Sequence, residues 1–280
     1  MSLFDLREPI SAWSHGAGMI AALPVVWLLL RRGRDALRSA ATADESCDRD
    51  FHQGKLVCLA VFGACLVFCY GASMLYHAAK LQGEPLGRLQ RLDHVGIFLM
   101  IAGTFTPAAW ALMRPLWMRG GLVLVWGLAL TCAARVWIGG PFPPWLATSV
   151  YLGLGWGMIV GYYDIQRGRG HRMLLTLPLG GALYSVGAVV NLAHRPDLFP
   201  GVFGSHELFH MFVLAGTAAH LHFMFHVVLP AGPPVRSATE TETEQGTEPI
   251  RGRFATPNFS RPQGVGMNAA SGAVYVDNGS

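Results

Sequence analysis

Charged side chains are scarce in this sequence: Asp, Glu, Lys and Arg make up 14% of its 280 residues, whereas hydrophobic residues make up 52%. A soluble domain usually carries about 25% charged residues. Seven stretches of roughly 17 to 25 residues have almost no charge, and each is long enough to cross about 30 Å of hydrocarbon. A soluble helical bundle would need polar helix faces that these stretches lack. We therefore predict an all-α, seven-transmembrane helix bundle in the cell membrane, with helices at residues 14–30, 55–79, 93–113, 120–138, 145–163, 173–193 and 206–229.

Cysteine is sparse as well, and the five cysteines do not form a disulfide framework. Four of them (Cys58, Cys65, Cys69 and Cys132) fall within predicted helices, where a buried thiol behaves as a small apolar side chain. The net charge of +4 is spread over loops, and no basic cluster is interleaved with aromatic residues, so nucleic acid is not an expected partner. The expected partners are membrane lipids, including a lipid substrate or ligand within the bundle. No protein partner is indicated.

The segments outside the predicted helices differ in character. Basic residues follow the first apolar stretch rather than precede it, and no small-residue cleavage pattern ends it, so we interpret it as a retained helix. The connection 31–54 is charged and hydrophilic. Residues 231–280 are rich in Ser, Thr, Glu, Gly and Pro and lack an apolar period. They are predicted to form a disordered polar tail after a transmembrane domain at 1–230.

Two histidines four residues apart, His206 and His210, open the last apolar stretch. Positions i and i+4 of a helix lie on one face about 6 Å apart along the axis, so imidazoles at these two positions can coordinate one metal ion. His77 and Asp93 lie at two other predicted helix ends. With seven crossings, the second helix ends on the side of the amino terminus, and the third and seventh helices begin there. All four side chains are therefore expected in the same leaflet.

Three neutral imidazoles from His77, His206 and His210 would leave a tetrahedral Zn²⁺ with a fourth position for water, which is typical of a catalytic site. Zinc can bring the pKa of that water down to about 7. Asp93 could act as the general base or as a hydrogen-bond acceptor of the water, and it could also cap its helix, because Asp is favoured there. Ser73 lies one turn before His77, so its hydroxyl could orient an imidazole, the water or an oxyanion.

The other histidines are interpreted as unrelated to the metal. A single histidine near a helix end is usually an interfacial polar residue. His220 shares the face of His206 but lies about 15 Å deeper than His210 at 1.5 Å per residue, too far for the same ion. His222 and His226 point elsewhere. The interfacial group consists of His15, His94, His171 and His194.

Several motifs resemble, in order and spacing, those of the hemolysin III family within the progestin and adipoQ receptor group. They are Ser14–Gly18, Ser73–His77, Leu92–Ile97, Gly103–Pro107, Gly180–Tyr184 and His206–Gly216. The resemblance covers residues 14 to about 229 and implies a seven-helix bundle that holds zinc through His77, His206 and His210. It also implies that Asp93 is associated with the zinc-bound water. Relatives among the adiponectin receptors and alkaline ceramidases are linked to lipid-amide hydrolysis.

Three functions are compatible with these residues. The first is a zinc-dependent membrane hydrolase, similar to a ceramidase, that uses zinc-activated water to cleave a lipid amide or ester. The second is a receptor or lipid-homeostasis sensor in which zinc cross-links the second and seventh helices and no reaction is catalysed. The third, a pore-forming hemolysin, is suggested only by the family name, and the polar groups gather at one end of the helices rather than along a path. The orientation is left open, because the positive-inside rule places the amino-terminal side outside the cytoplasm, whereas adiponectin receptors keep it inside.

Overall fold

The computed structural model describes residues 6–42, 46–157, 159–166 and 174–233. Within these ranges the architecture is all-α, as predicted, and the strand-like pairing is limited to an isolated bridge between Phe199 and Phe203. The helices are α1 (Pro9–Thr42), α2 (Ser46–Ala78), α3 (Gly83–Leu112), α4 (Pro115–Gly139), α5 (Pro144–Gly157), α6 (Ile159–Gln166), α8 (Thr176–Ala193) and α9 (Ser205–Phe223), the last continued by a π-helical turn, η1 (Met224–Val228).

Six helices of the described ranges are long and apolar enough to cross a membrane: α1, α2, α3, α4, α8 and α9 together with η1. The fifth predicted span, 145–163, is covered by α5 and α6, which have 14 and 8 residues. Each is shorter than the roughly 20 residues that a crossing needs, so a seventh crossing stays a prediction. The predicted tail (from residue 234 on) and His171 lie outside the described residues, and the predicted domain boundary also stays a prediction.

The hydrophilic connection 31–54 is more helical than its composition suggests. The helix α1 continues through Thr42, and α2 begins at Ser46. Arg and Ala dominate the end of α1, and both are good helix formers. With 34 residues, α1 is about 51 Å long at 1.5 Å per residue, well beyond the hydrocarbon thickness.

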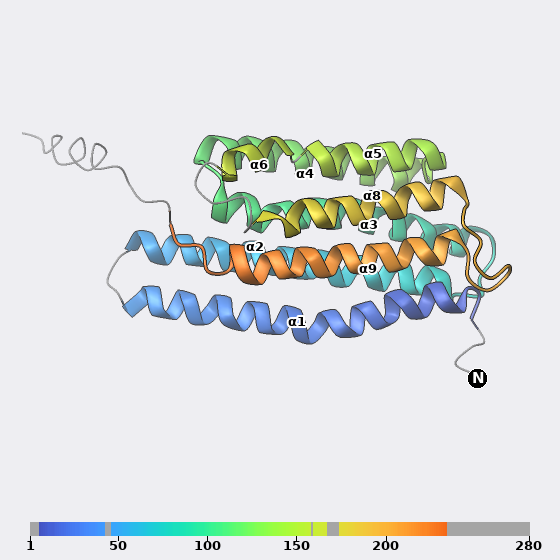
Figure 1. The fold of residues 1–280 in the computed structure, drawn as a ribbon, viewed down its shortest axis with the longest axis horizontal. Coiled ribbons are helices and arrows are strands. Elements are labelled where there is room, and N and C mark those ends of the chain that lie inside the picture. The colour runs from blue at the N-terminus through green and yellow to red at the C-terminus, as the bar shows by residue number, and fades with distance from the viewer. Residues whose placement is uncertain (1–5, 43–45, 158, 167–173, 234–280) are drawn as a thin grey trace, which may run out of the picture. The chain divides into compact units, whose positions relative to one another are not determined.

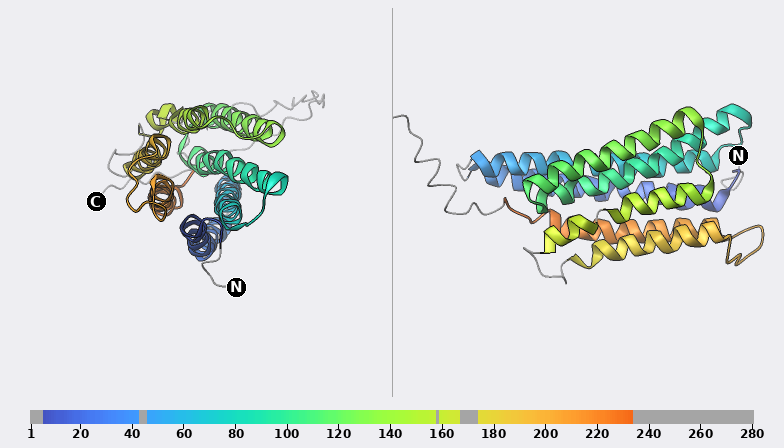
Figure 2. Two further views of the ribbon diagram at one scale, coloured as in Figure 1. Left: turned by 90° about the vertical axis from the view of Figure 1, so that its right-hand side faces the viewer. Right: turned by 90° about the horizontal axis from the view of Figure 1, so that it is seen from above.

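The helices pack as a ring. Neighbours in contact run from α4 through α3, α2, α1, α9 and α8 to α5, which returns to α4. Figure 1 shows them side by side along one direction, and the left view of Figure 2 shows the ring from its end. The helices α1, α3 and α9 begin, and α2 ends, at the right-hand side of Figure 1. The predicted site residues lie on three of these helices, α2, α3 and α9, whose ends therefore meet at one end of the bundle.

Small residues bring α3 close to α2. A Cβ atom on Gly96 would lie 3.0 Å from Cys69 Cα, and one on Gly103 would lie 2.8 Å from Cys65 Cβ. Both thiols are buried and free, which confirms their interpretation as packing residues. Because α2 and α3 are antiparallel, this contact places Asp93 toward the His77 end of α2.

Candidate metal centre

Three histidine rings converge at this end of the bundle. His77, from the end of α2, is 2% exposed, and His210, from the second turn of α9, is 1% exposed; His206 is half-buried. One ring nitrogen from each residue lies within 4.8 Å of the other two. The Nε2 atoms of His77 and His206 are 3.4 Å apart. The structure thus brings together the three side chains predicted as ligands, and this group could hold a metal ion.

The opposite nitrogen of each ring is held by an oxygen atom. His77 Nδ1 contacts the Glu8 carboxylate, and His206 Nδ1 lies 3.1 Å from Asn191 Oδ1. Carboxylate and amide oxygens only accept hydrogen bonds, so both Nδ1 atoms carry the proton and donate it. The lone pairs of these two rings therefore lie on Nε2, the nitrogens that face each other.

His210 follows the same pattern through Ser14. The Ser14 hydroxyl donates to the Ser11 carbonyl over 2.8 Å, and its oxygen lies 2.9 Å from His210 Nδ1. Because the one hydroxyl hydrogen is already used, Ser14 Oγ accepts from His210 Nδ1–H. The remaining lone pair of His210 is then also on Nε2. Metal-binding histidines almost always donate their other N–H in this way, so the donor set fits a metal ion.

Residues just before α1 are fastened to the end of α2. The Glu8 backbone N–H donates to the His77 carbonyl over 3.0 Å. Arg7 pairs with the Glu8 carboxylate at 3.2 Å and stacks 4.2 Å above the Tyr76 ring. The hydrogen bond from His77 lowers the pKa of the Glu8 carboxyl below its ordinary value, with a further contribution from the positive charge of Arg7. Glu8 is therefore held as a carboxylate against His77.

The start of α9 is fixed by Glu207, which lies between the two histidines. Its Oε2 accepts the Gly204 backbone N–H over 3.0 Å, and its Oε1 accepts the Ser11 hydroxyl at 2.9 Å. The first of these bonds satisfies a backbone donor left free at a helix start. The second ties α9 to α1, and together they set the direction in which the two histidines point.

His15 was interpreted as an interfacial residue, and this interpretation is wrong. Its side chain is 5% exposed, and its ring stacks on His210 with centroids 3.8 Å apart and planes 5° from parallel. Neither of its ring nitrogens has a hydrogen-bond partner among the described residues. The other face of His15 lies 5.0 Å from Tyr70, whose hydroxyl donates to Thr217. His15 therefore braces the ring of a candidate ligand without belonging to the ligand group.

The two predicted catalytic residues lie near the cluster. Asp93 is half-buried on α3, and the packing of Gly96 on Cys69 places it toward the His77 end of α2. Ser73 is 2% exposed on α2, one turn before His77. By contrast, His220 is turned to the Leu177 carbonyl at 3.2 Å, and His222 stacks on His226 with centroids 4.0 Å apart. These three histidines lie apart from the centre, as predicted.

Comparison with known proteins identifies the family. A sequence model of the family described as haemolysin-III related matches residues 5–221. The chain belongs to this family. It is 32% identical to the hemolysin-3 homolog of Bacillus subtilis (strain 168), over 81% of this chain and 95% of that protein. It is 30% identical to hemolysin-3 of Bacillus cereus, over 82% of this chain and 95% of that protein.

A more distant relative is the adiponectin receptor protein of Drosophila melanogaster, 28% identical over 79% of this chain and 51% of that protein. The recognition of the hemolysin III family, within the group that includes adiponectin receptors, is thus confirmed. This haemolysin-III-related protein is accordingly a multi-pass membrane protein, in agreement with its six long apolar helices within the described ranges.

Sequence reasoning missed the oxygen atoms that hold the three rings, on Glu8, Ser14 and Asn191. Helix parity could have pointed to them. In the predicted order of seven crossings, the first helix begins, and the sixth ends, on the side of the amino terminus, so all three residues would be expected in the same leaflet as His77. The order of the crossings gives the depth of these residues but not the direction of their side chains. It would therefore have suggested candidate hydrogen-bond partners without showing which histidine each one contacts.

Proposed function

We propose that this haemolysin-III-related protein holds a zinc ion through His77, His206 and His210 and hydrolyses an amide or ester bond of a membrane lipid. The observation that carries the proposal is the convergence of three nitrogens within 4.8 Å while each opposite nitrogen donates to an oxygen. Three protein ligands with histidine prominent among them are typical of catalytic zinc. In the proposed topology, α5 and α6 together make the fifth of seven crossings.

Zinc in such a site supplies Lewis-acid activation of water and of a carbonyl group. Asp93 is assigned as the base that takes a proton from the attacking water. The contact of Gly96 with Cys69, which places Asp93 toward the His77 end of α2, supports this assignment. Ser73, one turn before His77, is assigned as the hydroxyl that donates to the carbonyl oxygen as negative charge develops there. The water oxygen bonds to the carbonyl carbon, the C–N or C–O bond breaks, and the proton held by Asp93 passes to the leaving amine or alcohol.

The depth of the cluster supports a lipid as the substrate. His206 and His210 lie in the first two turns of α9, and His77 lies in the last turn of α2. These positions are at the end of the apolar helices, where the head group of a lipid meets its hydrocarbon chains. The amide or ester bond that joins the head group to the hydrocarbon chains would therefore lie at the depth of the histidines.

The test compares wild type, Asp93→Ala and His210→Ala, purified and incubated with a ceramide and with a phospholipid. Wild type is expected to contain about one zinc per chain and to release fatty acid. Asp93→Ala should keep its zinc and lose about 100-fold or more of its turnover, the usual contribution of a general base. His210→Ala should lose both. Hydrolysis by protein that contains no metal would refute the proposal.

A second function is favoured by the way in which the cluster joins different helices. His77 comes from α2, the histidine pair from α9, and their supporting oxygens from Glu8, Ser14 on α1 and Asn191 on α8. A metal ion here would cross-link the bundle, as in a receptor or sensor, and the similarity to an adiponectin receptor agrees with that role. In this case chelation would lower the melting temperature, and no lipid would be hydrolysed.

A further inference from the structure

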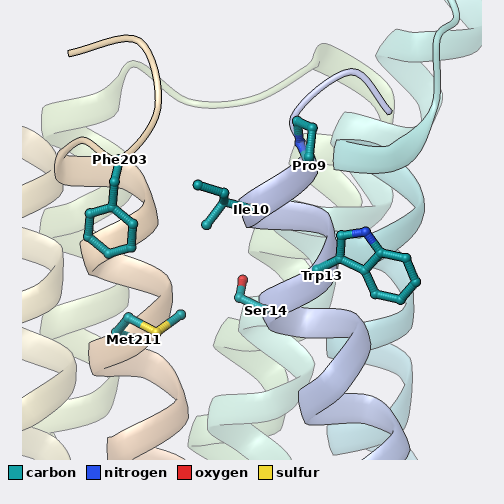
Figure 3. A pocket seen from close by; sticks show the side chains of 6 residues that line it. All are labelled: Pro9, Ile10, Trp13, Ser14, Phe203 and Met211. Atoms are coloured by element: carbon teal, nitrogen blue, oxygen red, sulfur yellow. The ribbon is translucent and has the colours of Figure 1, made fainter. Parts of the chain in front are cut away.

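An apolar groove separates α1 from α9 at the end of the bundle that holds the histidines. Its volume is about 410 Å³, within the range of small-molecule sites. Figure 3 shows Ile10 and Ser14 on α1 pointing toward Phe203 and Met211 across an open space. The lining residues are Pro9, Ile10, Trp13, Ser14, Phe203 and Met211.

The groove and the metal centre share one residue. Ser14 contributes the hydroxyl of an otherwise apolar lining, and the same oxygen lies 2.9 Å from His210 Nδ1. Met211, on the opposite wall, directly follows His210 in α9. A molecule in the groove is therefore separated from a candidate ligand by a single side chain.

The groove is bounded along the helices by a close contact between α1 and α9. The helix α1 packs extensively on α2 but only sparsely on α9. One turn below Ser14 the two helices do meet, because a Cβ atom on Gly18 would lie 2.6 Å from Leu214 Cδ2. Two of the lining residues, Trp13 and Met211, are 37% and 36% exposed. The groove thus ends about one turn below Ser14.

We propose that this groove is the lateral path by which a single hydrocarbon chain of a membrane lipid reaches the metal centre, with the first polar linkage of that lipid beside Ser14. The proposal rests on the proposed function. Five of its six lining residues lie on α1 and α9, which are long and apolar enough to cross a membrane, so the hydrocarbon chains of the bilayer begin beside it. Its lining offers a head group no charged partner. Ser14 Oγ has donated its hydrogen to the Ser11 carbonyl and accepts from His210, so its remaining lone pair can accept the N–H of a lipid amide. The Gly18–Leu214 contact stops the chain from passing deeper between the helices, so the chain extends outward into the bilayer.

Photolabelling of the full chain in phosphatidylcholine nanodiscs tests this path. The probe is a ceramide with a diazirine on its acyl chain, and labelled peptides are mapped after irradiation. Wild type is expected to show saturable labelling at Pro9–Ser14 and Phe203–Met211 that excess unlabelled ceramide removes. Filling the groove from either side, with Met211→Trp or Ile10→Trp, should reduce this labelling about tenfold. Ile20→Trp, at an exposed position of α1 outside the groove, should leave it unchanged.

The contrary outcomes are distinct. Labelling that cannot be saturated and is even over all exposed helix faces would overturn the path, as would saturable labelling that persists in both filled variants. Cross-links between two copies through the groove peptides would assign the groove to a second chain and would also overturn it. Zinc content and hydrolysis are measured on the same samples. Hydrolysis without labelling of the groove would contradict the lipid path and leave the proposed function intact. Saturable labelling of the groove in a protein that contains no zinc would contradict the proposed function and leave the path intact.

Discussion

Glu8 holds His77 at two points. Its carboxylate accepts the His77 Nδ1–H, and its backbone N–H donates to the His77 carbonyl over 3.0 Å. One contact sets the orientation of the ring, and the other fixes the backbone that carries it. A candidate ligand at the end of α2 is therefore positioned by the segment that precedes α1, so the geometry of the centre depends on the amino-terminal residues.

Replacing Glu8 by Ala is expected to weaken metal binding by about 10- to 100-fold, the usual effect of removing a hydrogen-bond partner from a ligating histidine. Glu8→Gln should lose less, because its amide oxygen can still accept from Nδ1. The measurement is a zinc titration in competition with a chelator. Glu84→Ala is the matched control, because this glutamate is exposed and pairs with Arg88 and Arg91 instead of a histidine. Equal affinities of Glu8→Ala and wild type would show that the contact does not support the site.

His15 is expected to act through its shape. His15→Ala removes the ring that stacks on His210 and leaves a cavity, so the melting temperature should fall and zinc should dissociate more readily. His15→Phe keeps a ring of similar form without polar nitrogens, so it should retain both properties close to wild type. Thermal melts and zinc dissociation rates on the three proteins separate the cases. A Phe variant as defective as the Ala variant would show that the nitrogens of His15 are needed.

Lys55 is predicted to stabilise the opposite end of the bundle. It is 1% exposed, and its ammonium donates to the carbonyls of Leu229 and Ala231 over 2.8 and 2.6 Å. Lys55→Met leaves these carbonyls without their charged donor, which should cost about 1.5–3 kcal/mol per bond in the free energy of unfolding. The melting temperature should fall while zinc content stays at the wild-type level, because the metal centre is at the other end.

Arg38→Met is the control for Lys55→Met. Arg38 lies near the end of α1 with 81% of its side chain exposed, and its pair with Asp35 spans 3.9 Å. A surface pair of this kind contributes little to stability, so this variant should melt close to wild type. A Lys55 variant as stable as the Arg38 variant would contradict the role assigned to the buried ammonium.

Two sequence features predicted the convergence of the three histidines: the spacing of His206 and His210, and the side of the membrane on which each predicted helix begins or ends. The four-residue spacing put His206 and His210 on one face, and an odd number of crossings put His77 in the same leaflet. These are properties of chain length and of helical period, which a sequence displays directly. The same reasoning gave the all-α class and placed the apolar spans over helices.

The other features of the site depend on packing between helices distant in sequence. His15 has no periodic partner, and its stacking on His210 arises only because α1 lies beside α9. Likewise, the hydrogen bond from His206 to Asn191 depends on how α8 and α9 are rotated about their axes. The connection 31–54 was misjudged for a local reason: its charge suggested a loop, although its arginines and alanines favour a continued helix.

Metal analysis of the purified chain, wild type beside His210→Ala and His226→Ala, tests the central claim most directly. His226 lies in η1, where it bonds to the His222 carbonyl, so its loss should not affect the centre. Wild type and His226→Ala are expected to retain about one zinc per chain after dialysis against a weak chelator, and His210→Ala to retain none, because a catalytic zinc site keeps three protein ligands. Equal metal content in all three proteins, or none in wild type, would contradict a zinc centre built from His77, His206 and His210.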